Sequence, residues 1–339
     1  MKQVTTILAI LVGFTMNGQW SYNSNNTGVQ ASTCTASGSY STAMGDGTTA
    51  SGDYSTSMGR STAASALYST AMGRSTAASA LYSTAMGYGT DASGYFSTAM
   101  GSSTTASALY STAMGDGTIA SGSRSTAMGS YTTASDYASL SIGRFNSVNS
   151  TVTAGGSATS FDTDNAAFVI GNGTGSSTKS DAFVVYFNGN ATLSGDLTIN
   201  SDERLKDNIQ PLGSTLNKLH QIEGKTYSFK KDEEHTPKIG VLAQEVQAVF
   251  PELVTEGGDG ILSVNYQGLV PVLINAINEQ DAKMSEQEVK MSEQDAKIAA
   301  LEAQNEQLAI ASKKIAALEE MVRFLAVQQS QTTSSVAAN

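Results

Sequence analysis

A serine and a lysine five residues apart, Ser201 and Lys206, form the pair with the clearest chemical potential in this sequence. A serine hydroxyl is a weak nucleophile unless a neighbouring base takes its proton. A lysine amine can be that base only when its pKa, ordinarily about 10.4, is lowered by desolvation or nearby positive charge. Arg204 lies close enough in sequence to supply such a charge. The structural alternative is a helix cap, since Ser-Asp-Glu at a helix start usually bonds free backbone N–H groups.

Other polar residues favour structural interpretations. His220 and His235 stand alone, without the spacing of metal ligands, so no metal site is expected. Asp162 and Asp164 are expected to be solvated in a loop. The glycine-rich run 171–175 is followed by no helix pattern, which predicts a hairpin turn and not a phosphate loop. The sequence therefore predicts no cofactor.

Composition divides the chain just before the serine–lysine pair. Residues 1–200 contain no glutamate, no proline and only fifteen charged residues. All four prolines and most of the charges follow residue 200. The single cysteine, Cys34, excludes an intrachain disulfide and is expected to be a small buried residue. The formal net charge of −11 speaks against nucleic acid and anionic membranes as partners.

The N-terminus carries the parts of an export signal. Lys2 is followed by an apolar run, Ile7–Phe14, which predicts a secretory signal peptide over residues 1–19. The alternative is an apolar strand that caps the fibre. The run is too short to span a bilayer comfortably, and no other segment is predicted to cross a membrane. We therefore expect a secreted, cell-surface or virion-tail protein.

A fourteen-residue unit based on Tyr-Ser-Thr-Ala-Met-Gly repeats eight times. The units begin at Tyr40, Tyr54, Tyr68, Tyr82, Phe96, Tyr110, Arg124 and Ala138. Such a strict period indicates a stack of similar structural units, of which each half-unit has the alternation of a short strand. Two short strands and two turns per unit predict one coil of a narrow β-solenoid, with the glycine permitting a turn.

The alternation within a unit predicts two different faces. One face carries Tyr68, Thr70 and Met72, and the other carries Ser69, Ala71 and Gly73. One methionine per coil is a thin core for a single chain. We therefore expect the face of small residues to pack against other chains.

The unit Ser-Thr-Ala-Met-Gly-x-x-x-x-Ala-Ser resembles the head repeats of trimeric autotransporter adhesins over about residues 31–145. This resemblance implies a trimer of parallel β-rolls. The sequence departs from that family because no amphipathic β-barrel segments close it. Ladders of identical side chains suit multivalent weak adhesion, with a host-surface glycan or protein as the receptor, although a plain structural spacer is an equal alternative.

Residues 150–200 lose the repeat and predict a β connector. Three strands are expected, over Ala166–Ile170, Asp181–Phe187 and Ala191–Ile199, with Gly- and Asn-rich turns between them.

Four sequence blocks follow the change in composition. They are Ser201–Ile209, Lys238–Val246, Phe250–Val254 and Val264–Val270. In this order they resemble the S74 peptidase family, the intramolecular chaperone domains of phage tailspikes and fibres, over about residues 200–280. The resemblance implies a serine–lysine dyad with Ser201 as nucleophile, Lys206 as base and the scissile bond at Asn200–Ser201. Gln244, Glu245 and Tyr266 also match the family and are expected to hold the fold.

From about Gly268 to Gln328 the chain is predicted to form one helix, with Pro271 in its first turn. Apolar residues recur every seven positions, which predicts a coiled coil. One seam line holds Val270, Ile277, Met284, Met291 and Ile298, and the other holds Leu273, Gln280, Gln287, Gln294, Leu301 and Leu308. Beyond Leu308 the pattern moves to Ile315, Leu318, Val322 and Leu325, which predicts a break in the heptad phase. Three strands are implied by the two resemblances.

Together these patterns predict a mainly β fibre followed by an α+β chaperone domain that ends in a trimeric coiled coil. The expected parts are a signal peptide (1–19), β-roll repeats (20–149), a β connector (150–200), an S74-like domain (201–268), a coiled coil (269–328) and a disordered tail (329–339). The expected function is a homotrimeric tail-fibre-like or adhesin-like protein that cleaves itself once at Asn200–Ser201. The alternative is a structural fibre that retains its chaperone.

Overall fold

The computed structural model describes residues 20–22, 28–230 and 235–336. The chain divides into two units, Met1–Asn200 and Ser201–Asn339, at the bond where its composition changes. Each unit is described by itself. The predicted signal peptide lies outside the described residues.

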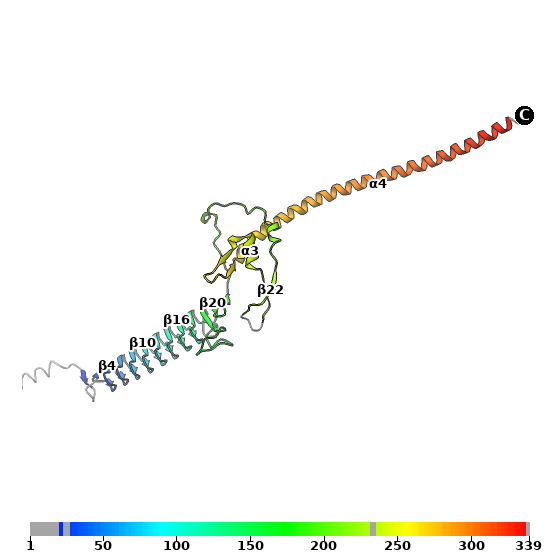
Figure 1. Ribbon diagram of the computed structural model, residues 1–339. Coiled ribbons are helices and arrows are strands. Elements are labelled where there is room, and N and C mark those ends of the chain that lie inside the picture. Colours follow the sequence, from blue (N-terminus) through cyan, green and yellow to red (C-terminus); the bar gives the residue numbers. More distant parts are fainter. Residues whose placement is uncertain (1–19, 23–27, 231–234, 337–339) are drawn as a thin grey trace, which may run out of the picture. The chain divides into compact units, whose positions relative to one another are not determined.

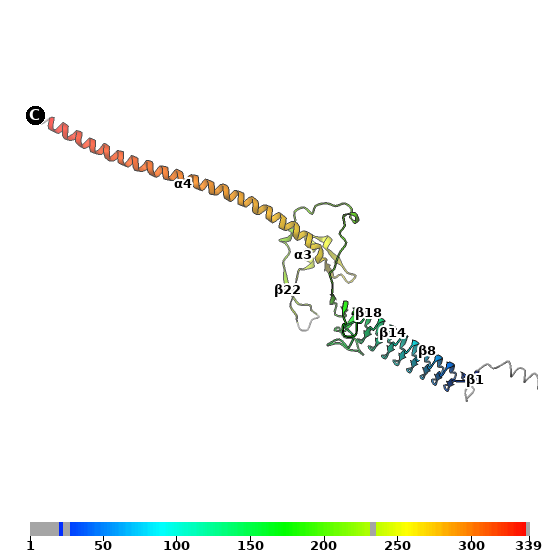
Figure 2. The same ribbon diagram turned by 180° about the vertical axis from the view of Figure 1, so that it is seen from behind.

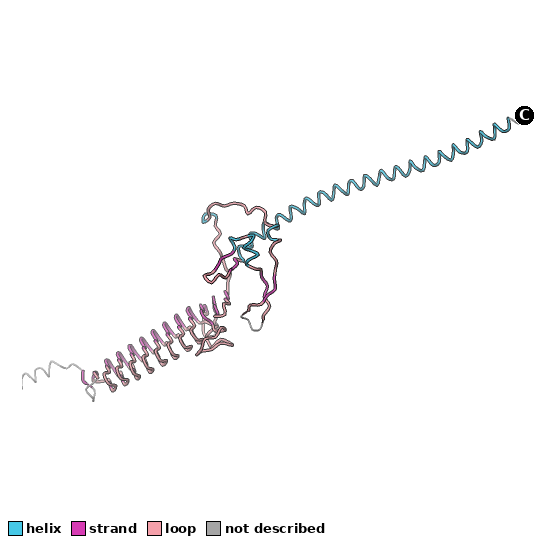
Figure 3. Tube along the Cα trace, viewed as in Figure 1, coloured by secondary structure: helices cyan, strands magenta, loops and turns pink. Residues whose placement is uncertain are grey.

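Unit 1 is a β-solenoid in which each fourteen-residue coil contributes one long and one short strand, as Figure 1 and the reverse view in Figure 2 show. The long strands are β4 (Thr42–Asp46), β6 (Thr56–Arg60), β8 (Thr70–Arg74), β10 (Thr84–Tyr88), β12 (Thr98–Ser102), β14 (Thr112–Asp116), β16 (Thr126–Ser130) and β18 (Leu140–Arg144). The short strands are β3 (Thr35–Ala36), β5 (Thr49–Ala50), β7 (Ala63–Ala64), β9 (Ala77–Ala78), β11 (Asp91–Ala92), β13 (Thr105–Ala106), β15 (Ile119–Ala120) and β17 (Thr133–Ala134). Figure 3 shows them as strand segments separated by regular turns.

Two sheets form the walls of the solenoid. The short strands make an eight-stranded sheet, and the long strands belong to a thirteen-stranded sheet that starts with β1 (Trp20–Tyr22) and β2 (Val29–Ala31). Coils pair in parallel, so that each residue lies beside its equivalent in the next unit, as Met72 does beside Met86. The predicted solenoid of fourteen-residue repeats is confirmed.

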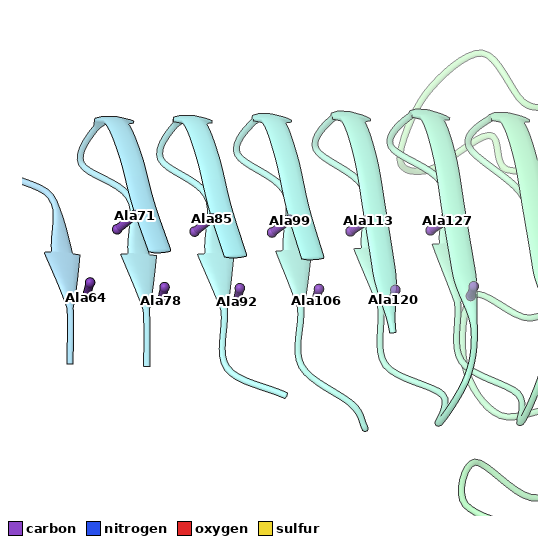
Figure 4. Packing of buried hydrophobic residues seen from close by; sticks show 11 residues of the cluster. Ala64, Ala71, Ala78, Ala85, Ala92, Ala99, Ala106, Ala113, Ala120 and Ala127 are labelled. Carbon is purple, nitrogen blue, oxygen red and sulfur yellow. The ribbon is translucent and has the colours of Figure 1, made fainter. Parts of the chain in front are cut away.

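The prediction about the two faces was wrong. Ala71 and Ala78 point into the coil and are completely buried, as Figure 4 shows for their whole ladders, whereas Met72 lies half-buried on the outer face. The walls are too close for a larger side chain. Where a serine replaces the alanine, Ser57 Oγ lies 2.7 Å from Thr62 Oγ1 of the opposite wall. The small residues therefore form the inside of each coil, and methionine is left for contact outside it.

The turns hold unusual backbone conformations. Gly87 has φ +123°, and a Cβ atom there would lie 1.9 Å from the carbonyl oxygen of Gly101 in the next coil. The first residue of each unit also has positive φ, such as 57° at Tyr68, which is costly for an aromatic residue. These rings stack along the solenoid with centroids 4.8 to 5.1 Å apart, from Tyr40 to Tyr110. Ring stacking offsets part of the backbone strain.

Amide side chains cover both edges of the short-strand sheet. Gln30 Oε1 accepts a hydrogen bond from Ala36 N (2.9 Å) at the first edge. At the last edge, Asn146 accepts from Thr133 N (2.7 Å) and donates to Thr133 O (2.8 Å), as a further strand would. Because open strand edges invite pairing with other chains, these amides end the sheet.

The connector extends the long-strand sheet. β19 (Ala166–Asn172) pairs in parallel with β18, and β20 (Asp181–Tyr186) and β21 (Ala191–Leu193) follow in antiparallel order. The three predicted strands are present, but the last ends at Leu193 instead of Ile199. The chain bends at Ser194–Gly195, where glycine interrupts the strand pattern.

Unit 2 is a small α+β domain with one long helix. Its elements before that helix are η1 (Glu203–Leu205), α2 (Leu216–Leu219), β22 (Lys225–Tyr227), β23 (Lys238–Gly240), α3 (Ala243–Val249), η2 (Pro251–Leu253), β24 (Val254–Glu256), β25 (Leu262–Val264) and η3 (Tyr266–Gly268). β22 pairs with β23 and β24 with β25, both antiparallel. Val246, Phe250 and Val272 are its buried apolar centre.

The helix α4 runs over Leu269–Val336. The helix continues beyond Gln328 into the segment 329–339, which was expected to be a disordered tail. No glycine or proline in that segment stops the helix. Its seam residues lie on the surface of the single chain, with Leu273 49% and Leu308 60% exposed. Among the described residues of unit 2, no other element covers this stripe of apolar residues.

Glu279 of α4 binds the chain segment that precedes α2. Its carboxylate accepts hydrogen bonds from Thr215 N (2.6 Å), Leu216 N (3.3 Å) and Ser214 Oγ (2.9 Å). Asn275, one turn earlier on α4, also donates to it (3.0 Å). The backbone N–H of Thr215, ahead of the other donors, holds the pKa of Glu279 below its usual value.

Two glycines two residues apart test the stacking of the coils. We expect Gly87→Ala to destabilise the solenoid by at least about 2 kcal/mol, because both its backbone conformation and the carbonyl of Gly101 exclude a side chain. Gly89→Ser is the control, since Ser75 and Ser103 hold the equivalent turn position with φ near 55° and 53°. Thermal unfolding followed by the β-sheet circular dichroism signal measures both. An equal effect of the two changes would contradict the stacking geometry.

Acidification tests the Glu279 contact. Because the folded-state pKa lies below the ordinary value of about 4.3, the carboxylate stabilises the fold above that pH, and this contribution is lost as pH falls through the folded-state pKa. We expect Glu279→Gln to lower the unfolding temperature of unit 2 at about pH 7 and to have little effect at about pH 3. Glu286→Gln is the control, since that carboxylate pairs with Lys290 on the exposed helix surface. A pH-independent effect of Glu279→Gln would argue against the charged contact.

Candidate functional site

Ser201 and Lys206 lie at the start of unit 2, on either side of the single turn η1. Lys206 Nζ donates a hydrogen bond to Ser201 Oγ at 2.7 Å. The turn is closed by Lys206 N, which donates to Glu203 O at 3.0 Å. The 3₁₀ turn therefore brings together the two side chains that the sequence singled out.

The cap of this turn is Asp202 and not Ser201. An Asp202 carboxylate oxygen accepts a hydrogen bond from Arg204 N at 2.9 Å. Ser201 is therefore not the helix cap that the sequence offered as its structural role. Sequence reasoning missed this role of Asp202, although aspartate is among the preferred capping residues.

Arg204 is bonded to Asp202 and does not act as a free charge. Its Nη2 lies 2.6 Å from Asp202 Oδ2, and its Nε donates to Oδ1 at 3.0 Å. This side-chain contact lowers the pKa of Asp202 and raises the pKa of Arg204. The positive charge of Arg204, which the sequence suggested as a neighbour for Lys206, is thus paired mainly with Asp202.

The serine and lysine are open to solvent in the single chain. Asn200, Ser201 and Lys206 are all exposed, as are the residues on either side of them. A lysine becomes a base near neutral pH when burial or neighbouring positive charge disfavours its charged form. Within one chain Ser201 and Lys206 are therefore in contact, but both side chains remain exposed to solvent.

Two of the other residues that match the S74 pattern make structural contacts. Glu245 Oε2 accepts from Glu223 N at 2.9 Å and Oε1 lies 3.4 Å from Lys225 Nζ. Tyr266 Oη accepts from Val241 N at 3.2 Å. Gln244 lies exposed on α3. These contacts join α3, η3 and the strands before them.

Within the residues that the structure describes, no group of three or more His, Cys, Asp or Glu side chains is placed to hold a metal ion. His220 is exposed at the end of α2, and His235 is exposed with φ 51°. Across the same described ranges, no helix has the length and apolar character needed to cross a membrane.

Both units match known sequence families. Residues 36–62, 64–90, 92–118 and 120–146 match the YadA head domain repeat. Residues 201–255 match Peptidase S74, described as the chaperone of endosialidase, and this match begins at Ser201.

Curated relatives are long tail fibre proteins of bacteriophages. The chain is 39% identical to the long tail fiber protein Gp37 of Escherichia phage AR1 over 97 residues. This matched stretch is 26% of this chain and 9% of that protein. The Gp37 of Salmonella phage S16 is 34% identical over 99 residues, 26% of this chain and 13% of that protein. A probable tail fiber protein of Escherichia phage Phieco32 is 34% identical over 90 residues, 25% of this chain and 12% of that protein. The chain thus spans a small part of these relatives.

These matches confirm both resemblances drawn from the sequence. The chain combines head repeats of the YadA type in unit 1 with a Peptidase S74 chaperone-of-endosialidase segment that starts unit 2.

Proposed function

We propose that the chain forms a homotrimeric, tail-fibre-like protein whose segment from Ser201 onward is an intramolecular chaperone that removes itself by cleaving the Asn200–Ser201 bond. The observation that carries this proposal is the 2.7 Å contact between Lys206 Nζ and Ser201 Oγ. That contact lies at the first residue of the Peptidase S74 match and at the boundary between the two units.

The cleavage is an N-to-O acyl shift followed by hydrolysis. Ser201 Oγ attacks the carbonyl carbon of Asn200 while neutral Lys206 takes the hydroxyl proton. The proton passes to the amide nitrogen of Ser201 as the peptide bond breaks, which leaves an ester between Asn200 and Ser201 Oγ. Water then hydrolyses the ester, so that one product ends at Asn200 and the other begins at Ser201. The reaction occurs once per chain.

Assembly supplies the switch for this reaction. Because Ser201 and Lys206 are exposed in a single chain, the packing of three copies has to bury the lysine before it can act as a base. Cleavage then follows correct assembly and does not precede it.

The same exposure favours a second candidate, a structural fibre that keeps its chaperone segment. If assembly leaves Lys206 in water, the serine has no effective base and the bond remains intact. The fold and the oligomer are the same in both cases, and only the fate of residues 201–339 differs.

The proposed number of chains in the assembly and the proposed place of the protein are inferred from the matching families and relatives. The long tail fibre proteins among the relatives support a place on a virion tail. A host-surface glycan or protein is the proposed receptor, because ladders of identical side chains along the repeats suit multivalent weak adhesion. The exposed seam of α4 supports association in parallel, because a helix with an apolar residue line every seven positions buries that line against copies of itself. The head repeats indicate three copies.

Substitution of each dyad residue tests the cleavage. The wild-type chain is expected to give a fragment whose N-terminal residue is Ser201, and Ser201→Ala is expected to stay at full length. Lys206→Met should slow cleavage by at least about 100-fold, because the serine loses its base. Lys230→Met, a change at an exposed lysine of the same unit, should cleave normally. Denaturing electrophoresis with N-terminal sequencing of the fragment measures all four. A wild-type chain that stays intact would support the structural fibre instead.

Charges in the seam of α4 test the trimer. Ile298 and Leu301 are seam residues that are 53% and 50% exposed in the single chain. In the Ser201→Ala chain, we expect Ile298→Asp with Leu301→Asp to abolish the trimer, since two desolvated carboxylates per helix would meet at its axis. Ala299→Asp with Ala303→Asp is the control, because these positions face outward in the same heptads. Sedimentation equilibrium gives the mass. Equal behaviour of the two variants would remove the coiled coil from the proposal.

A further inference from the structure

The outer face of the thirteen-stranded sheet continues beyond the repeats, and the pairs from Phe168 to Ile170 stay in step although the register shifts on either side of them. The methionine ladder ends at Met128, which pairs with Ile142, and Ile142 pairs in turn with Ile170. Ile170 lies opposite Phe183, and Phe183 lies opposite Leu193 on β21. Directly paired residues share a face of a sheet, so one apolar line runs from the solenoid to the end of the connector.

A second line of paired residues on the same face shows that a polar residue of the repeats gives way to apolar residues. Thr126 pairs with Leu140, Leu140 with Phe168, and Phe168 with Val185. The threonine of the repeats is thus replaced by large apolar residues in the connector. Val169 and Val184, on the opposite face, are buried within unit 1. The connector is therefore apolar on both faces. On the outer face its own chain leaves Phe168, Ile170, Phe183 and Val185 half-buried and Leu193 46% exposed.

Beyond β21 two more apolar side chains precede the scissile bond. Leu197 is 66% exposed and Ile199 is 64% exposed. They are two residues apart, the spacing at which side chains share one side of an extended chain. Asp196 is the only charged residue between β21 and Ser201. Ile199 is separated from the scissile bond by Asn200 alone.

The occupant that fits this segment is a second copy of the chain. The face formed by Phe168, Ile170, Phe183, Val185 and Leu193 continues the methionine face of the repeats, so it meets other copies wherever the repeats do. On the other side of the scissile bond, the exposed seam of α4 sets copies parallel and in register. Copies aligned in this way bring the segment of one chain next to the connector face of another.

We propose that Leu197 and Ile199 are positioning residues for self-cleavage, which seat on the β19–β21 face of a neighbouring copy and so fix the carbonyl of Asn200. This inference rests on the proposed function. It identifies the partner of the cleavage segment as a second copy of unit 1.

Fixing the carbonyl matters because the attack needs the reacting atoms about 3 to 3.5 Å apart with the correct alignment. In a single chain the segment 194–200 is exposed along its whole length and has no strand partner after Leu193. The serine and lysine are already in contact, so a single chain lacks two things, burial of Lys206 and a held carbonyl. Docking of Leu197 and Ile199 provides the held carbonyl after assembly.

The first test is the double variant Leu197→Ser with Ile199→Ser in the full chain. We expect it to form the same trimer by sedimentation and to cleave at least about 100-fold more slowly than wild type, since a small misplacement of reacting groups has that effect. Thr198→Ala is the matched control, because it lies between the two residues and points to the other side; it should cleave at the wild-type rate. Cleavage of the double variant at the wild-type rate in the trimer would overturn the proposal.

The second test does not depend on cleavage. In the Ser201→Ala trimer, hydrogen exchange of the amides of residues 196–200 should be slowed, and Leu197→Ser with Ile199→Ser should restore fast exchange. Fast exchange in the trimer without those changes would overturn the docking. If the wild-type chain is never cleaved but these amides are protected in the trimer, the docking stands and the proposed cleavage alone fails.

Discussion

The narrow width of one coil is the constraint on which the rest of this structure depends. Side chains from its two walls touch across the interior, as the 2.7 Å contact between Ser57 and Thr62 shows. The interior positions of the repeats hold Ala, Ser and Thr, with Cys34 at the equivalent place in the first coil, so the methionines lie outside the coil. The buried alanines contribute little hydrophobic free energy per residue, because the area each removes from water is small. A single chain therefore leaves its methionine face only half-buried, which fits the proposed association of copies.

The same narrow coil demands backbone conformations that few residues tolerate. Glycines such as Gly73, with φ 121°, let adjacent coils approach to strand spacing, and the aromatic residue at the start of a unit accepts positive φ. Stacking of that residue on its neighbours recurs along the solenoid, and Arg124 ends the row with its guanidinium 5.8 Å from the ring of Tyr110. The repeat is therefore stabilised mainly by contacts between equivalent residues of neighbouring coils, as in other solenoids.

The sequence predicted the period, the solenoid and the boundary before Ser201, because each depends on local spacing or composition. The pairing of that serine with Lys206 was implied by the resemblance to the S74 family. The sequence did not predict which face of a coil is inside. Alternation has two equivalent solutions, and only the distance between the walls decides between Ala71 and Met72. The amide caps at Gln30 and Asn146 also escaped prediction, since each replaces a strand from another part of the chain. The same holds for Glu279, whose donors lie more than sixty residues away in sequence.

Identical repeats cannot set their own register. If one copy slides along another by one unit, each methionine again meets a methionine, so the sliding costs little free energy along the shaft. Residues that occur once per chain have to supply the register, and they are concentrated after the repeats, at Phe168 and Phe183 of the connector and along α4. The bond proposed to be cleaved, Asn200–Ser201, lies between these two unrepeated regions. Under the proposed function, a chaperone segment that aligns the copies at one end is useful only until the connector holds them, and a bond placed between the two can then be broken without loss of register.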